Sequence, residues 1–214
     1  MTFAARLTTR ARVLTATLGL AATAAATLAT GGAAHADSAP AQRPPADSLA
    51  KVSAEQLLKV AQEQIGVEEN GAGGGTKFHS WYMGSQRAKE TVARDGGNVK
   101  AYANAPWCAM FVSWVGEQVG LRPSVGWDAY TVTYAQWFKD NGRFGTKATP
   151  GSVVFFDWDR SDDISGIDHV GLVKKDNGDG TITTIEGNTG NGKVEQRVRP
   201  KSQVVGYGYP QYAS

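Results

Sequence analysis

The sequence predicts an α+β fold in which helices come first and an antiparallel sheet follows. Up to about residue 140, apolar residues recur at helical spacing in three separate segments. After Pro150-Gly151, short apolar runs alternate with turns rich in Asn, Asp and Gly, as in strands joined by hairpins. A regular alternation of helices and strands would instead indicate a parallel sheet, so the sheet is expected to be antiparallel.

The first 36 residues have the pattern of a secretory signal peptide. Three arginines and no acidic residue precede a stretch without charge from Val13 to Ala36. Small residues lie three and one positions before Asp37, as at a cleavage site. A membrane anchor is the alternative, because 24 uncharged residues could span a bilayer, but Thr and Gly interrupt the stretch. We expect residues 1–36 to be removed and the protein to be secreted, either extracellular or associated with the cell wall.

Removal of this segment changes the net charge. The whole sequence has 22 Lys and Arg against 20 Asp and Glu, a net charge of +2. Without the three arginines of residues 1–36, 19 basic and 20 acidic residues remain, a net charge of −1. No basic run is left, so no nucleic-acid partner is expected. We also expect no stable membrane anchor after cleavage.

Residues 37–52 are rich in Ala, Pro, Ser and Gln and are expected to form a disordered linker. The folded domain is therefore predicted to span residues 53–214. Its first helix begins at the capping-box pattern Ser53–Gln56. The apolar pattern of this helix continues to Ile65, where Gly66 ends it.

Two further helices and five strands are predicted. Pro106 suits the first position of a helix with an apolar stripe, and Gly120 suits its end. Another helix covers about residues 131–140. The runs predicted as strands are residues 153–156, 169–173, 181–185, 194–198 and 204–209.

Cys108 is the only cysteine of the sequence, which excludes an intramolecular disulfide and multi-cysteine metal sites. In a secreted protein, an unpaired cysteine indicates an intermolecular bridge or a reactive nucleophile. Cys108 falls in the first turn of the helix predicted from Pro106, where free backbone amides and the helix dipole favour a thiolate and can stabilise an oxyanion. A structural cysteine would fit better in the middle of the apolar stripe. Position alone leaves both interpretations open.

A thiolate nucleophile needs a general base, and His169 on a predicted strand is the candidate. If residues 176–179 form a four-residue hairpin loop, Lys175 pairs with Gly180, and the numbers of all paired residues sum to 355. Glu186 then lies directly opposite His169 on the same face of the sheet. A carboxylate there would fix the tautomer and stabilise the imidazolium. Asn188 would return to the same face if the strand continues, and could also orient the ring. The alternative is a surface or core histidine without a catalytic role.

His79 is the other histidine that remains after cleavage. It follows a Gly-rich segment and is expected at the surface, with a place in a substrate groove as the alternative. A zinc site made of Cys108, His79 and His169 would lack any closely spaced pair of ligands, so it is not favoured.

Four short segments, in this order, resemble the CHAP domain, the cysteine/histidine-dependent amidohydrolase/peptidase family. They are residues 106–114 (PWCAMFVSW), 153–156 (VVFF), 168–171 (DHVG) and 185–189 (IEGNT). Residues 65–68 (IGVE) and 76–82 (TKFHSWY) also resemble the opening segment of the family. The resemblance covers roughly residues 53–210, which is nearly the whole expected mature domain.

The resemblance implies a papain-like fold with the nucleophile helix packed on the antiparallel sheet. It implies Cys108 as nucleophile, His169 as general base and then acid, and Glu186 and Asn188 as the residues that orient His169. Members typically cut peptidoglycan, either at the amide between N-acetylmuramic acid and L-alanine or within the peptide stem or bridge. We therefore expect a monomeric peptidoglycan hydrolase, an amidase or an endopeptidase.

Two features depart from the family pattern. Ser152 stands where the family usually has Asp, at a position outside the catalytic set. Residues 93–105 lack the acid-rich pattern that some phage members use for calcium, so no metal or other cofactor is expected. Asn104 is a candidate side-chain donor to the oxyanion, but none is assigned.

Three alternatives have the same or a related fold. A catalytically silent wall-binding domain could keep the fold, although the intact Cys, His, Glu and Asn set argues against it. A related papain-like peptidase family usually has Asp-Cys-Ser-Gly at its thiol, unlike the segment 107–110 (WCAM). A secreted antibacterial effector could share all of this chemistry.

Overall fold

The computed structural model describes residues 51–213. All of these residues belong to one compact unit. The expected signal peptide and nearly all of the expected linker lie outside the described residues and stay predictions. Val52, expected in the linker, is buried, and its carbonyl oxygen accepts a hydrogen bond from the Ala213 N–H (3.0 Å). Within residues 51–213, no helix has the length and apolar character needed to cross a bilayer.

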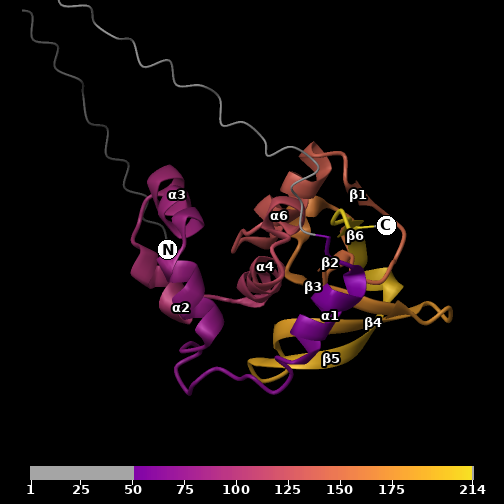
Figure 1. Cartoon of the computed structure of the whole chain (residues 1–214), viewed down its shortest axis with the longest axis horizontal. Coiled ribbons are helices and arrows are strands. Elements are labelled where there is room, and N and C mark those ends of the chain that lie inside the picture. Colours follow the sequence, from indigo (N-terminus) through magenta and orange to yellow (C-terminus); the bar gives the residue numbers. More distant parts are fainter. Residues whose placement is uncertain (1–50, 214) are drawn as a thin grey trace, which may run out of the picture. The chain divides into compact units, whose positions relative to one another are not determined.

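Helices precede a single six-stranded sheet, which confirms the α+β class (Figure 1). The helices are α1 (Ala54–Gln62), α2 (Lys77–Gly84), α3 (Gln86–Asp95), α4 (Cys108–Gln118), α5 (Arg122–Val125) and α6 (Thr131–Asp140), with short 3₁₀ helices at Val99–Asn104, Ile164–Gly166 and Lys201–Gln203. The strands are β1 (Phe144–Gly145), β2 (Val153–Phe156), β3 (His169–Asp176), β4 (Thr181–Thr189), β5 (Lys193–Pro200) and β6 (Val204–Gly208). They lie in the order β1-β6-β2-β3-β4-β5, and all neighbouring pairs are antiparallel.

The three predicted helices are confirmed, with corrections at their ends. Ser53 and Gln56 form the expected capping box, but α1 ends at Gln62, and Ile65 is 46% exposed. The helix α4, predicted from Pro106, begins at Cys108, two residues later than predicted. Ala105 is extended, as the residue before a proline usually is, and Trp107 is the non-helical N-cap.

Helices α2 and α3 were not predicted from the sequence. The α2 helix begins with a capping box in which the N3 residue is His79 instead of the usual Glu or Gln. The α3 helix has a predominantly polar sequence and buries only Ala88 and Thr91, so it lacks a long apolar stripe. Ser85 caps α3, since its side chain accepts a hydrogen bond from the Ala88 N–H (3.1 Å).

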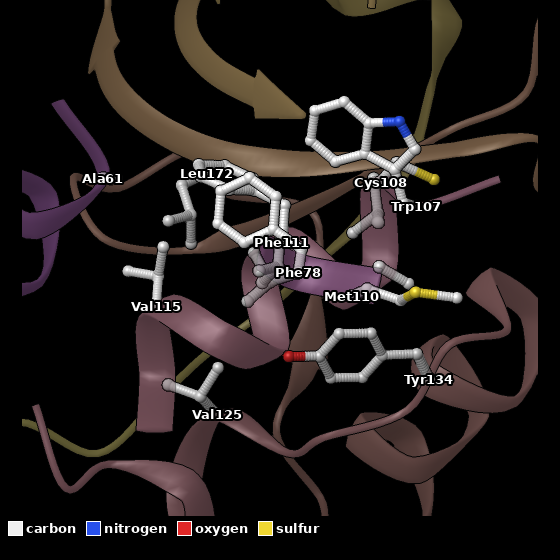
Figure 2. Close-up of a cluster of buried hydrophobic side chains, with 14 of the residues drawn as sticks. Ala61, Phe78, Trp107, Cys108, Met110, Phe111, Val115, Val125, Tyr134 and Leu172 are labelled. Atoms are coloured by element: carbon white, nitrogen blue, oxygen red, sulfur yellow. The ribbon is translucent and has the colours of Figure 1, made fainter. Parts of the chain in front are cut away.

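The α4 helix lies between α2 and the sheet, where it contacts β3 and β4 (Figure 1). Its core side chains are fully buried, and Phe78 of α2 packs edge-on against Phe111, with ring centroids 5.3 Å apart (Figure 2). A Cβ on Gly187 of β4 would lie 2.6 Å from the Phe111 Cβ and 2.9 Å from Trp107 Cζ3. The absence of a side chain at this position lets the first turn of α4 approach the sheet closely.

The predicted register of the β3–β4 hairpin is wrong. Asp176 pairs with Ile182 and Lys175 with Thr183, so the loop is longer than four residues. A register shift follows between Val173 and Lys175, and Leu172 then pairs with Ile185. His169 is therefore not directly opposite Glu186, although both side chains still lie on one face of the sheet.

Candidate active site

Cys108 is the first residue of α4 and is 4% exposed. In Figure 2 its sulfur points away from the apolar group that contains Phe111 and Val115. The first backbone bond of the helix runs from the Phe111 N–H to the Trp107 carbonyl oxygen (2.9 Å), and no side chain from Trp107 caps the turn. The N–H groups of Cys108, Ala109 and Met110 precede that bond, so they lack helical partners and face the thiol end of the helix. This arrangement suits a thiolate and a developing oxyanion.

The N-cap residue Trp107 is held on two sides. Its indole N–H donates to the Glu69 Oε2 (3.1 Å), and its ring stacks on Phe78 with centroids 5.3 Å apart and planes at 17°. The side chain is fully buried. These contacts fix the place at which α4 begins, and with it the position of the thiol.

His169 is the first residue of β3 and is buried. Its imidazole stacks against Trp158, with centroids 5.6 Å apart, and against Phe156, at 6.0 Å. The ring Nε2 lies 3.0 Å from the Glu186 Oε2. A carboxylate can only accept, so Nε2 carries a proton, and Nδ1 is the nitrogen left for Cys108.

The charge state of His169 follows from these neighbours. Burial alone would lower the pKa of the imidazole, but hydrogen bonding and charge attraction from Cys108 and Glu186 outweigh burial and raise this pKa to about 9. The imidazolium is thus the favoured form at neutral pH. It lies between a thiol and a carboxylate, as a thiol hydrolase requires.

Glu186 is fully buried and is held by three side chains. The Thr184 hydroxyl donates to Oε1 (2.5 Å), and the Arg199 guanidinium donates from Nε to Oε1 (2.9 Å) and from Nη2 to Oε2 (2.6 Å). Burial opposes ionisation of Glu186, but the hydrogen bonds from His169, Arg199 and Thr184 lower its pKa to about 2. Glu186 is therefore an anion at all moderate pH values.

Arg199 on β5 was missed by the sequence-based prediction. Its guanidinium also donates to the Thr189 hydroxyl (3.0 Å) and lies 5.0 Å from the centre of the Trp158 ring. Arg199 thus contacts both the carboxylate and an aromatic ring that stacks on His169. The one sequence signal that could have indicated Arg199 is its place in the alternation of side chains along β5. Arg197 has the same place in that alternation, so the signal does not distinguish the two arginines.

The expected contact between His169 and Glu186 is confirmed, but it forms diagonally across the strands. Gly171 intervenes, and a Cβ there would lie 2.7 Å from the Glu186 Cγ. The Glu186 side chain therefore crosses β3 over the glycine and reaches the imidazole. A residue with a larger side chain at position 171 would occupy this path.

Asn188 does not join this group. The β4–β5 register shifts between Glu186 and Thr189, and Asn188 has a left-handed backbone with φ of 54°. The strand thus does not continue regularly, which was the condition for Asn188 to return to the same face. Among the hydrogen bonds of residues 51–213, none joins the Asn188 side chain to His169 or Glu186.

His79 is buried, so the prediction of a surface position is wrong. Its Nδ1 lies 2.7 Å from the Thr76 hydroxyl, and its Nε2 lies 3.0 Å from the Ala105 carbonyl oxygen. His79 thus links α2 to the segment just before Cys108. In the described part of the chain, no group of three or more His, Cys, Asp or Glu side chains is arranged to hold a metal ion.

A pocket of about 230 Å³ opens beside Cys108. Its walls include Tyr102, Met110, Tyr130 and Asp168. The nearly buried thiol can therefore be reached by a substrate from this side.

Comparison with known families agrees with this geometry. Residues 99–188 match the family model of the CHAP domain. The chain contains a CHAP domain. The matched segment includes Cys108, His169, Glu186 and Asn188, and the helices and antiparallel sheet correspond to the papain-like α+β fold expected of that family. A CHAP domain is a cysteine/histidine-dependent amidohydrolase/peptidase, so the enzyme class is a hydrolase of amide bonds. No curated protein and no solved structure matches the chain.

Proposed function

We propose that this protein is a secreted enzyme that hydrolyses amide bonds of bacterial peptidoglycan, with Cys108 as its nucleophile. The observation that carries the proposal is the arrangement of Cys108 at a helix N-terminus with His169 and Glu186 behind it. The expected signal peptide and the wall substrates typical of the resembling family support the choice of substrate. The roles of the individual residues are part of the proposal.

In the first half of the reaction, the Cys108 thiolate attacks the carbonyl carbon of the scissile amide. The free N–H groups at the start of α4 stabilise the oxyanion of the tetrahedral intermediate. The His169 imidazolium gives its proton to the leaving nitrogen, and the C–N bond breaks. The products of this half are a free amine and a thioester on Cys108.

In the second half, neutral His169 takes a proton from water, and the hydroxide attacks the thioester carbonyl. The C–S bond breaks, the carboxylic acid leaves, and the thiolate–imidazolium pair is restored. Glu186 accepts a hydrogen bond from the Nε2–H of His169 throughout (3.0 Å), so it orients the ring and stabilises its charge.

Digestion of purified peptidoglycan tests the proposal. The parent protein and the Cys108→Ala variant are incubated with purified sacculi, and the new chain ends are identified by mass spectrometry. We expect the parent to release either free muramyl lactyl groups, as an amidase would, or new peptide amino termini, as an endopeptidase would. The identity of the ends also names the bond.

Ser113→Ala is the matched control, because it removes one buried side-chain atom from the same helix. It should cleave like the parent, whereas Cys108→Ala should release nothing above background. No release by the parent, or equal release by the parent and Cys108→Ala, would refute the proposal.

A further inference from the structure

The pocket beside Cys108 has walls that are suited to one kind of chemical group. Its volume of about 230 Å³ corresponds to about eight water molecules at ~30 Å³ each. This space accommodates one amino-acid side chain or one chain terminus. Because Cys108 itself lines the pocket, such a group would belong to the residue next to the scissile bond.

Apart from Cys108, which reacts as a thiolate in the proposed mechanism, Asp168 is the only Asp, Glu, Lys or Arg among the described residues that line this pocket. It is exposed, and its backbone is fixed because its N–H donates to the Phe156 carbonyl oxygen (2.9 Å). Its Oδ2 accepts the Trp158 N–H (2.9 Å), which positions the carboxylate and leaves Oδ1 available. The pocket is therefore electrostatically complementary to a cation and unfavourable to a second carboxylate.

Two tyrosine rings form another part of the wall. Tyr102 and Tyr130 pack edge to face, with ring centroids 6.4 Å apart and planes at 72°. Aromatic rings of this kind attract an ammonium group through their electron-rich faces. The rings and the Asp168 carboxylate thus favour the same ligand chemistry by independent means.

We propose that this pocket is a substrate subsite that binds a primary ammonium group, through Asp168 and the faces of Tyr102 and Tyr130. The inference rests on the proposed function and deepens it, since peptidoglycan stems contain a diamino acid with such a group. The ammonium could be the side-chain amine of that residue or a free peptide α-amine. Both have the same chemistry, and the experiment separates them.

The test compares three versions of one stem peptide: unmodified, acetylated on the side-chain amine, and acetylated on the α-amine. Values of kcat/KM are measured for the full-length parent, for Asp168→Asn and for the control Asp162→Asn. Asn at position 168 can still accept the Trp158 N–H, so the local fold should be kept. Asp162 is an exposed acid of the preceding loop and lines a different pocket.

We expect acetylation of one of the two amines to lower kcat/KM of the parent about tenfold, the typical loss for one charged hydrogen bond. The amine whose acetylation has this effect is the one that is bound. Asp168→Asn should cleave the unmodified and that acetylated peptide at similar rates, and Asp162→Asn should behave like the parent. A general effect of the Asp168 charge on neighbouring His169 would lower kcat/KM for all three peptides alike. If Asp168→Asn instead no longer distinguishes the unmodified peptide from the acetylated one, Asp168 binds the amine.

Equal rates of the parent on all three peptides, or an equal loss on all three in Asp168→Asn, would overturn the inference and leave the proposed function standing. A second measurement is independent of turnover. Binding of the three peptides to Cys108→Ala, followed by calorimetry, should show the same preference, and the double variant with Asp168→Asn should lose it. Cleavage of no peptide or sacculus by the parent, together with tight amine-selective binding, would contradict the proposed function and support the subsite.

Discussion

Glu186 is an anion inside the protein because neighbouring side chains replace the water that it loses. Thr184, Arg199 and His169 all bond to its two oxygens, and its pKa falls to about 2 despite full burial. A buried carboxylate with one neighbour fewer would hold a proton more readily and orient the imidazole less well. We therefore expect the catalytic role proposed for His169 to depend on Arg199, which bonds to Glu186 and to Thr189.

Substitution of Arg199 tests that dependence. Arg199→Met removes the charged donor while it keeps an apolar stem against Trp158. We expect kcat to fall about 10- to 100-fold, the equivalent of a charged hydrogen bond of about 1.5–3 kcal/mol. The acid limb of the pH–rate profile should also move to higher pH, because Glu186 would lose donors that hold its pKa low.

Arg197→Met is the control for that variant. Arg197 lies on the same strand, pairs with Glu195 at 3.2 Å and is 39% exposed, so its loss should leave the rate and the pH profile unchanged. If kcat of Arg199→Met equals kcat of Arg197→Met, Glu186 does not need the hydrogen bonds from Arg199 to orient His169.

The raised pKa of His169 predicts how the rate depends on pH. The proton that His169 gives to the leaving amine is held up to about pH 9, so kcat/KM should decline as the pH rises through about 9. The unfolded chain, in which the pKa has its ordinary value of 6.5, binds fewer protons than the folded protein between these values. Stability should therefore also fall as the pH rises from about 6.5 to 9. A rate that declines near pH 6.5 would contradict the assigned environment of His169.

Among the secondary-structure elements, the register of β3 against β4 determines whether the side chains of His169 and Glu186 come into contact. Next to the loop, the predicted register was wrong by three positions, because the first β3–β4 pair is Asp176 with Ile182. The Thr181 side chain bonds to Asn177 (2.9 Å) and to Asp179 (2.6 Å) in the loop instead of pairing with β3. The register shift before Lys175 then reduces the difference to two positions. An even difference keeps every side chain on its predicted face, so the predicted contact forms although the predicted pairing does not.

Gly171 offers a test at this scale. A Cβ at this position would lie 2.7 Å from the Glu186 Cγ, so Gly171→Ala should displace the Glu186 side chain from His169. We expect kcat to fall about tenfold or more, because an orienting hydrogen bond to a charged group is lost. Steady-state kinetics should show little change in KM, since Gly171 does not line the pocket beside Cys108.

Gly84→Ala is the control for the glycine variant. Nothing lies within 4 Å of a Cβ at position 84, so this protein should keep its activity and its melting temperature. An active Gly171→Ala protein would mean that Glu186 reaches His169 by another path.

The elements that the sequence predicted well are those with a strong local signal. Helix α6 coincides with the predicted residues 131–140, and strands β2 to β5 contain their predicted apolar runs, whereas β6 ends at Gly208, one residue before the end of the predicted run 204–209. The parts that were missed depend on contacts between distant residues. His79 is buried and contacts the Ala105 carbonyl oxygen 26 residues away, and Arg199 reaches Glu186 from the neighbouring strand β5. Neither partner is visible in the local sequence.

At the scale of the whole molecule, the site is assembled from the two halves of the chain. The helical half supplies the thiol at the start of α4, and the sheet supplies the imidazole and the carboxylate. The close approach of α4 to β4 at Gly187 brings the halves together. The site therefore requires the helical part and the sheet of the described residues together.

Processing of the leader is a prediction for the whole chain. If residues 1–36 are a signal peptide, expression of the full-length gene in a bacterial host should yield a secreted protein that begins at Asp37, because signal peptidase cuts after small residues at these positions. Intact-mass measurement and N-terminal sequencing of the medium check this outcome. A protein that stays in the membrane fraction with Met1 or Thr2 at its N-terminus would favour the anchor alternative.

In the proposed mechanism, the Cys108 thiol performs the hydrolysis. Because the sequence has one cysteine, a thiol reagent has a single target in the whole chain. The most direct measurement follows peptidoglycan hydrolysis against the fraction of Cys108 alkylated by iodoacetamide, read by intact mass in the same samples. We predict that activity falls in proportion to labelling and is lost at one label per chain. Hydrolysis that continues unchanged in fully labelled protein would contradict the account.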